Sequence, residues 1–217
     1  ELFELANTDS LTELPNRRAL KERMNQALAD CKKDNTKLAI VMLDLDNFKN
    51  VNDTIGHEYG DQVLLEIAER WKKFMTDDDF LARLGGDEFA ILIEDFQSVQ
   101  ELDEHLRQFM SAVEEKIILK DEEYYITASM GVAMFPSDTM DESQLLKYAD
   151  MAMYAAKYQG KKRMCYFDGI MDDVIESTVH MESVIRHAVQ SDSFSLVYQP
   201  QYTAENKKLR GFDTLVR

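Results

Sequence analysis

A glycine turn between two apolar segments constrains the fold of this chain most strongly. Residues 80–84 and 88–93 are short and rich in apolar side chains, and Gly85-Gly86 separates them. Two such segments joined at a glycine pair predict an antiparallel β-hairpin. Since an isolated hairpin is marginally stable in water, we expect this one to belong to a larger sheet.

Helical and strand-like segments alternate through the first three quarters of the chain. Apolar residues recur at helical spacing in residues 17–31, from residue 61 to 74, in 102–113 and in 145–156. The continuous apolar run 38–43 predicts a buried strand, and 124–134 and 164–167 predict further strands. Strands alternating with helices and including a hairpin indicate an α/β sandwich, with a mixed central sheet and flanking helices.

The length of 217 residues predicts more than one domain, because a domain takes roughly 150 residues. We expect one domain over residues 1–168, a linker helix within 169–192, and two strands in 193–217 that open a second domain. The chain begins with Glu1 and ends inside a predicted strand, so we expect it to be part of a longer protein.

Charge and composition exclude several classes of function. The formal net charge of −16 repels a phosphate backbone, so we expect no nucleic-acid partner. No apolar run approaches the roughly 20 residues that span a bilayer, so this part of the chain should make no membrane contact. The two cysteines, Cys31 and Cys165, match no zinc or disulfide pattern and favour a cytoplasmic location. An upstream anchor in the parent protein stays open.

Two acidic pairs follow strand positions that should meet at one edge of the sheet. Asp44 and Asp46 end the buried strand, and Asp87 and Glu88 follow the glycine turn. Two carboxylates about 4 Å apart repel by about 4 kcal/mol, so a cluster of them favours a divalent cation. The alternative is that these are solvated loop acids, and spacing alone does not separate the two.

Polar residues between the buried strand and the next helix suit a nucleotide. Asn52 and Asp61 have the donors and acceptors that guanine requires, although turn formation and helix capping are their commoner roles. No Walker-type sequence is present, which excludes a P-loop. The basic residues Lys157, Lys161 and Lys162 either hold phosphates or complement a helix C-terminus.

Five motifs together resemble the GGDEF family of diguanylate cyclases. They are residues 9–18 (DSLTELPNRR), 44–61 (DLDNFKNVNDTIGHEYGD), 83–89 (RLGGDEF), 127–131 (TASMG) and 149–157 (ADMAMYAAK). The resemblance covers residues 7–167 in the same order. It implies a palm-like fold related to nucleotidyl cyclases and polymerases, and a homodimer that condenses two GTP into cyclic di-GMP and pyrophosphate.

The resemblance also implies roles for individual residues. Asp44, Asp87 and the Leu45 carbonyl would bind Mg²⁺, or alternatively Mn²⁺, and Glu88 would lie near a second metal or the attacking hydroxyl. Asn52 and Asp61 would read guanine. The phosphate contacts would be Lys49, Lys157 and Lys161, together with backbone amides near Asn47 and Phe48.

Two departures from the family pattern bear on function. Thr76 stands where an inhibitory Arg-x-x-Asp sequence ending at Asp79 would have arginine, which predicts weak product inhibition. Residues 193–217 resemble the start of an EAL phosphodiesterase domain, with Asp213-Thr214-Leu215 in place of Glu-Ala-Leu. This linkage leaves an alternative function open, a catalytically silent GTP-binding domain that controls an attached EAL domain.

Overall fold

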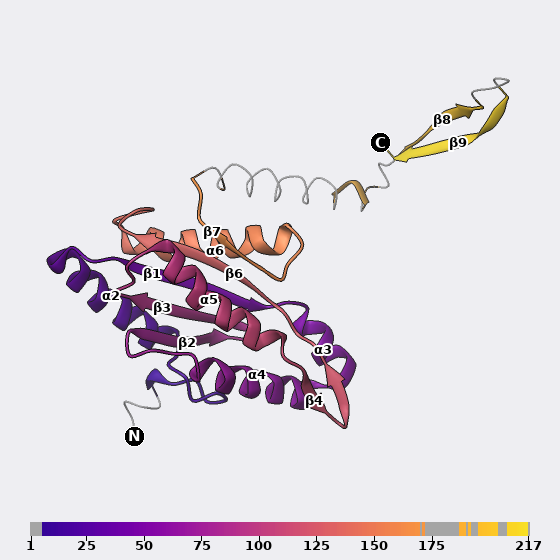
Figure 1. Cartoon of the computed structure of the whole chain (residues 1–217). Coiled ribbons are helices and arrows are strands. Elements are labelled where there is room, and N and C mark those ends of the chain that lie inside the picture. The colour runs from indigo at the N-terminus through magenta and orange to yellow at the C-terminus, as the bar shows by residue number, and fades with distance from the viewer. Residues whose placement is uncertain are drawn as a thin grey trace. The chain divides into compact units, whose positions relative to one another are not determined.

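The computed structural model of the chain describes residues 6–169, 171, 187–189, 191, 195–203 and 208–216. The chain divides into two compact units, Glu1–Asp172 and Asp173–Arg217. Figure 1 labels the helices and strands in chain order.

A five-stranded mixed sheet forms the centre of the first unit. Its central strand β1 (Leu38–Leu45) pairs antiparallel with β3 (Glu88–Glu94) on one side and with β6 (Ala128–Phe135) on the other. The edge strand β2 (Asp79–Gly85) pairs antiparallel with β3, and β7 (Arg163–Tyr166) lies parallel to β6. The predicted mixed sheet and its glycine-turn hairpin are therefore confirmed.

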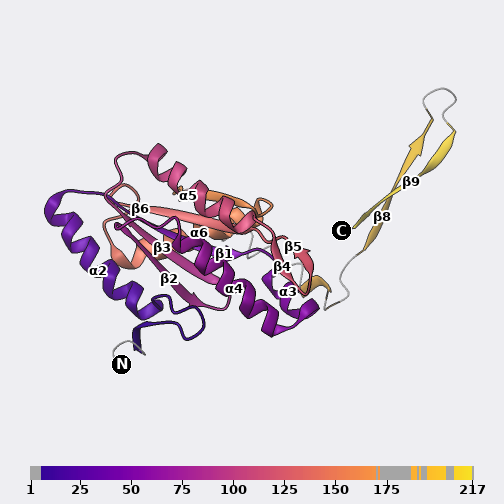
Figure 2. The ribbon, with the colours of Figure 1, turned by 60° about the horizontal axis from the view of Figure 1, so that its bottom comes forward.

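Helices cover both faces of this sheet, so every residue of β1 is buried. Its residues Ala39, Val41 and Leu43 pack in one core cluster with α4 (His57–Lys72) and α5 (Val99–Glu114). The alternate residues pack in a second cluster with α2 (Arg17–Asp34) and α6 (Glu142–Tyr158). Figure 2 shows α4 and α5 lying in front of the sheet.

The close approach of α6 to the sheet depends on Gly131 of β6. A Cβ atom at this position would lie 2.0 Å from the Met153 amide nitrogen and 2.1 Å from the Ala149 carbonyl oxygen, both backbone atoms of α6. Real Cβ contacts are never so short, so a larger residue would push α6 away. This contact places the C-terminal end of α6 over the end of β1.

Two local differences separate the structure from the sequence-based expectations. Residues between the buried strand and the helix from residue 61 form a further helix, α3 (Phe48–Ile55), and α4 begins at His57. The strand expected at 124–134 is divided: β5 (Glu122–Tyr124) pairs with β4 (Ile117–Leu119), and β6 begins at Ala128. Between them, the Thr127 carbonyl accepts a hydrogen bond from the Asp46 amide outside the ladder (2.7 Å).

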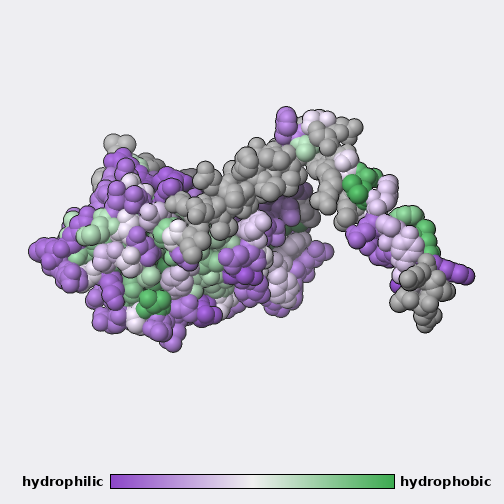
Figure 3. All heavy atoms as spheres, turned by 90° about the horizontal axis from the view of Figure 1, so that it is seen from above, coloured by the Kyte–Doolittle hydropathy of each residue, from purple (hydrophilic) through white to green (hydrophobic). Residues whose placement is uncertain are grey.

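In the second unit, β8 (Leu196–Tyr202) and β9 (Leu209–Val216) form an antiparallel pair, as two strands were expected there. Figure 3 shows apolar side chains on this hairpin, and Leu196, Tyr198 and Phe212 are all more than half exposed. Most of the predicted linker helix lies outside the described residues, although 171 and 187–189 are helical. In the described part of the chain, no helix combines the length and apolar character needed to cross a membrane.

Candidate nucleotide and metal site

The ends of β1 and β3 bring together the acids that the sequence placed at one sheet edge. Asp44 is directly opposite Glu88 in the β1–β3 register. The Leu45 amide donates to the Asp87 carbonyl at 3.3 Å, which ties the end of β1 to the glycine turn. Asp44 alternates with the residues of β1 that face α4 and α5, so its side chain points to the α2–α6 face.

Asp44 is nearly buried and has a positively charged partner. It is 8% exposed, and Oδ2 lies 2.6 Å from Nζ of Lys157, which extends from α6. Burial raises the pKa of Asp44; the Lys157 ammonium opposes this, and the charges of Asp87 and Glu88 add to it. A buried carboxylate repelled by two neighbouring acids is stabilised by a nearby cation.

These oxygen donors fit a divalent metal ion in chemistry, although the described residues do not form a complete cage. Among them, no three Asp, Glu, His or Cys side chains are grouped closely enough to hold a metal ion. Asp44 and Asp87 are hard oxygen ligands of the kind that Mg²⁺ takes together with water and substrate phosphates, so a closed protein cage is not required. In this structure Lys157 supplies the positive charge beside Asp44.

Asp46, two residues further along, has a structural environment. Its carboxylate accepts hydrogen bonds from Thr127 Oγ1 (2.6 Å), Ser129 Oγ (2.7 Å) and the Lys162 amide (3.0 Å). These neutral donors satisfy both carboxylate oxygens and connect the end of β1 to the start of β6 and to the turn after α6. The loop-acid alternative is therefore wrong for both Asp44 and Asp46, and only Asp44 has a cation as partner in the described residues.

The start of α3 lies beside Lys161. Asn47 adopts a left-handed conformation (φ 59°) and makes no side-chain capping bond to α3 in the described structure. Its Oδ1 instead accepts from Lys161 Nζ at 2.7 Å. The buried Phe48 ring anchors the first turn of α3, and Lys49 is exposed. An ammonium beside uncapped helix amides is an arrangement that can bind an anion.

Asn52 and Asp61 lie at the contact between α3 and α4. A Cβ atom on Gly60 would be 1.9 Å from Asn52 Oδ1, so glycine is required where the two helices meet. Asp61 is the next residue and is exposed. Because α4 begins at His57 after a cap at Gly56, the helix-capping alternative for Asp61 is excluded. The structure thus places the Asn52 side chain against Gly60, the residue that precedes Asp61.

Sequence reasoning missed the ion pair that fixes the glycine turn. Arg83 contacts Asp9 Oδ1 with Nη1 at 2.8 Å and donates to the Gly86 carbonyl with Nε and Nη2 at 3.1 and 2.8 Å. Burial opposes ionisation of Asp9, yet hydrogen bonds from Thr12 and Arg83 lower its pKa overall. The N-terminal motif therefore holds Asp87 and Glu88 in place from outside the sheet.

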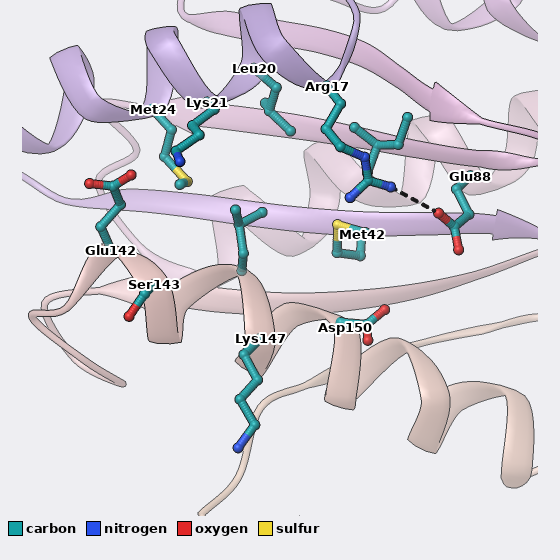
Figure 4. A pocket seen from close by; sticks show the side chains of 12 residues that line it. Arg17, Leu20, Lys21, Met24, Met42, Glu88, Glu142, Ser143, Lys147 and Asp150 are labelled. Carbon is teal, nitrogen blue, oxygen red and sulfur yellow. Dashed lines mark hydrogen bonds and ion pairs between the residues drawn. The ribbon is translucent and has the colours of Figure 1, made fainter.

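A second missed contact reaches Glu88 from α2. Arg17 Nη2 lies 3.4 Å from Glu88 Oε2, at one end of a pocket of about 570 Å³ between α2 and α6 (Figure 4). The residues are 71 positions apart, so no local spacing could have indicated the pair. An arginine at the start of a helix was the one available signal.

At the position of the expected product-inhibition site, neighbours hold one carboxylate oxygen of Asp79, while Oδ1 is buried without a hydrogen-bond partner among the described residues. Its side chain is 1% exposed, and Oδ2 accepts from the Thr76 amide at 2.7 Å and lies 2.8 Å from His105 Nε2. The Thr76 side chain offers a hydroxyl where the family pattern would present a guanidinium.

Comparisons with known proteins agree with this architecture. The family model "Diguanylate cyclase, GGDEF domain" matches residues 6–163. The chain belongs to the GGDEF family. In that family, diguanylate cyclases generally use divalent metal ions.

Individual relatives cover the whole chain or its first unit. MucR of Pseudomonas aeruginosa, a bifunctional diguanylate cyclase/cyclic di-GMP phosphodiesterase, is 36% identical over all 217 residues, which are 32% of its length. The diguanylate cyclase TpbB from the same species is 38% identical over 72% of this chain and 36% of its own length. The chain thus spans about a third of these curated relatives.

Solved structures confirm the fold. The GGDEF domain of TpbB superposes with a TM-score of 0.74 at 35% identity and covers 78% of this chain and 99% of that one. The coiled coil and GGDEF domain of DgcB from Caulobacter crescentus, solved in complex with cyclic di-GMP, gives 0.70 at 29% identity, covering 76% and 87%. The mixed sheet with flanking helices is therefore that of GGDEF domains.

Proposed function

We propose that residues 1–168 form a diguanylate cyclase domain that condenses two GTP into cyclic di-GMP as a homodimer. The observation that carries this proposal is the end of β1, where the nearly buried Asp44 lies opposite Glu88 with Lys157 as its partner. Asp46, by contrast, is satisfied by neutral donors. A nearly buried acid that is repelled by neighbouring acids and paired with a partly exposed ammonium is suited to binding a charged ligand.

Each protomer would hold one GTP along this edge. Asn52 and Asp61 would bind guanine at the α3–α4 contact, where a carboxylate can accept the hydrogens of the base. Lys161 and the first amides of α3 near Asn47 and Phe48 would hold the phosphates, with the exposed Lys49 assisting.

Asp44, Asp87 and the Leu45 carbonyl would hold Mg²⁺, or Mn²⁺ in its place. The ion would offset negative charge on the triphosphate and polarise the α-phosphate. Lys157 would then move from Asp44 to a phosphate oxygen, because the ion takes over its position beside the carboxylate.

The reaction joins nucleotides from the two protomers. The 3′-hydroxyl oxygen of one GTP attacks the α-phosphorus of the other and forms a new O–P bond. The bond from that phosphorus to the bridging oxygen breaks, pyrophosphate leaves, and Glu88 is the carboxylate that takes the hydroxyl proton. The two nucleotides then exchange roles: the 3′-hydroxyl of the second attacks the α-phosphorus of the first, a second pyrophosphate leaves, and the ring closes. Two GTP thus give one cyclic di-GMP and two pyrophosphates.

The test is to assay cyclic di-GMP by chromatography after incubating the chain with GTP and Mg²⁺. The chain should be fused behind a dimerising coiled coil, with Asp87→Ala as the paired variant. We expect product from the wild type and none from the variant. Equal turnover by both proteins would overturn the proposed site.

A regulatory, catalytically silent domain is the second candidate. It is favoured by relatives such as PdeR of Escherichia coli, a cyclic di-GMP phosphodiesterase 35% identical over 98% of this chain. Residues 193–217 would then begin an EAL-like domain, in which Asp213 of β9 accepts a hydrogen bond from Gln201 at 2.6 Å. Detectable GTP binding with no product from the enforced dimer would favour this candidate.

The cysteines support a cytoplasmic location for the domain. Cys31 is buried and Cys165 is half-buried, and both thiols are free. Free thiols without a disulfide framework are typical of reducing compartments. Growth of cells that carry a tagged full-length parent, followed by fractionation, would test this location.

A further inference from the structure

Two neighbouring arginines at the start of α2 have different partners. Arg17 reaches across to Glu88 on β3 (3.4 Å), whereas Arg18 pairs with Glu22 on its own helix (3.0 Å). Arg18 therefore belongs to the solvent face of α2. Arg17 is directed toward the sheet edge where the candidate reaction takes place, as Figure 4 shows.

The Arg17–Glu88 pair stands at one end of the pocket between α2 and α6. The floor of this pocket is apolar and includes Leu20, Met24 and Met42. Its volume of about 570 Å³ lies in the range of ligand sites, and it opens on the α2–α6 face of the sheet. The pocket is therefore continuous with Glu88 but on the opposite side of the sheet from α4.

This position separates Arg17 from the residues proposed to bind the guanine and phosphates of the protomer's own GTP at the α3–α4 contact and the start of α3, next to Asn47 and Lys161. Asp44 and its partner Lys157 lie nearer to Arg17, because Asp44 is opposite Glu88 in the sheet. In the proposed reaction Glu88 takes the proton of the attacking 3′-hydroxyl, so Arg17, 3.4 Å from Glu88, would lie next to the nucleotide that brings this hydroxyl. That nucleotide is carried by the other copy of the chain.

Charge favours the same role. Most of the chain is acidic, with a net charge of −16, and Glu88, Glu142 and Asp150 line this pocket. An incoming triphosphate would be repelled by these acids unless a cation met it. Arg17 and Lys21 are the basic residues of α2 in the pocket lining.

The existing ion pair is easily exchanged. The Arg17 side chain is 68% exposed and that of Glu88 is 42% exposed, and exposed pairs contribute little to stability. A phosphate group offers arginine a stronger, two-pronged contact. When the Arg17 guanidinium moves to the phosphate, the Glu88 carboxylate would be free to receive a proton.

We propose that Arg17 binds a phosphate of the GTP presented by a second copy of this chain, and that this contact releases Glu88. The inference rests on the proposed cyclase function and adds a substrate-binding residue that acts between protomers.

The experiment compares Arg17→Ala, Arg17→Lys and Arg18→Ala with the wild type, each fused behind the same dimerising coiled coil. Turnover of GTP to cyclic di-GMP is measured first. Affinity for a non-hydrolysable GTP analogue is then measured on the unfused chains, at a concentration where sedimentation shows monomers. Arg18→Ala is the matched control, because it removes the adjacent arginine on the same exposed turn.

We expect Arg17→Ala to lower kcat by roughly tenfold or more, the size typical of a lost charged hydrogen bond. Arg17→Lys should recover part of this loss, since it keeps the charge without the planar fork. Arg18→Ala should match the wild type. The monomer's affinity for the analogue should be the same in all four proteins, because the contact is made across the dimer.

Three outcomes would overturn the inference. Unchanged turnover in Arg17→Ala, while the wild type makes product, would overturn it alone. An equal loss of analogue affinity in the Arg17→Ala monomer would place Arg17 in its own protomer's site. No product from any dimer, the wild type included, would overturn the proposed function and this inference with it.

Discussion

Asp44, near the end of β1, and Asp79, at the start of β2, are two buried aspartates whose partners differ in kind. Asp44 lies beside the Lys157 ammonium and is repelled by nearby acids. Asp79 is held by the Thr76 amide and His105, and its side chain is almost inaccessible. Asp44 thus has a charged partner that is itself 31% exposed, whereas the neighbours of Asp79 close access to its carboxylate.

The same comparison works at shorter range between Asp44 and Asp46. Both are buried at the end of β1, but three neutral donors hold Asp46. The difference teaches that burial alone does not mark a functional acid. Between these two acids the partners differ, and the neutral donors that saturate the Asp46 carboxylate leave no position there for substrate or metal.

The largest expected effect separates Asp44 from Asp79 by activity. Asp44→Asn should lower cyclic di-GMP formation by about a hundredfold or more, since it removes a carboxylate proposed to hold the ion that offsets negative charge on the triphosphate. Asp79→Asn should stay within about twofold of the wild type. Steady-state assays of the enforced dimers measure both activities. Similar losses of activity in the two variants would contradict the functional distinction between Asp44 and Asp79.

The next effect concerns the stability that Asp46 provides. Asp46→Ala removes the acceptor for two hydroxyls and an amide, and should lower the free energy of unfolding by roughly 2 to 4 kcal/mol. Urea unfolding followed by circular dichroism measures this change. Asp44→Asn is the control and should cost much less. A loss below about 1 kcal/mol for Asp46→Ala would show that its hydrogen bonds are dispensable.

A smaller effect depends on pH through Asp9. Its pKa is lowered in the folded protein from 3.8, so its stabilisation is present above the unfolded value and disappears as pH falls through the folded value. Asp9→Asn should therefore cost about 1 to 2 kcal/mol at pH 7 and less at pH 3, which lies below the unfolded value. Unfolding curves at the two pH values check this, and an equal cost at both would contradict the role of the charged Asp9–Arg83 pair.

The smallest expected effect concerns product inhibition at the position of Thr76 and Asp79. Thr76→Arg should tighten inhibition by cyclic di-GMP by roughly fivefold, because a guanidinium restores two-pronged contacts to guanine or phosphate. Adding His105→Ala should strengthen the effect, since it removes one partner of Asp79. Product-inhibition curves measure both variants. If inhibition is already as strong in the wild type, Thr76 has not weakened this site.

Much of the fold followed from apolar periodicity, because buried strands and amphipathic helices carry strong local patterns. The helix α3 did not. Its sequence FKNVNDTI contains two asparagines, a valine and a threonine, none of which favours helix on its own. Tertiary contacts form it instead, through the buried Phe48 ring and the packing of Asn52 against Gly60.

The candidate site was predictable where motifs carried it and unpredictable where distant residues meet. Motif positions indicated Asp44, Asp87 and Lys157 as members of one site. The pairs Arg17–Glu88 and Asp9–Arg83 join residues more than 70 positions apart, and their contact depends on how α2 and the N-terminal turn dock on the hairpin. The satisfied state of Asp46 likewise depends on β6 and on the turn after α6.

The most direct test of the account is thermal unfolding of the unfused chain with and without Mg²⁺ and a non-hydrolysable GTP analogue. At a ligand concentration about a hundredfold above its dissociation constant, the wild type and Asp79→Asn should melt roughly 5 to 10 °C higher. Asp44→Asn should show no such shift. A shift retained in Asp44→Asn, or lost in Asp79→Asn, would contradict the assignment of the β1 end as the nucleotide and metal site.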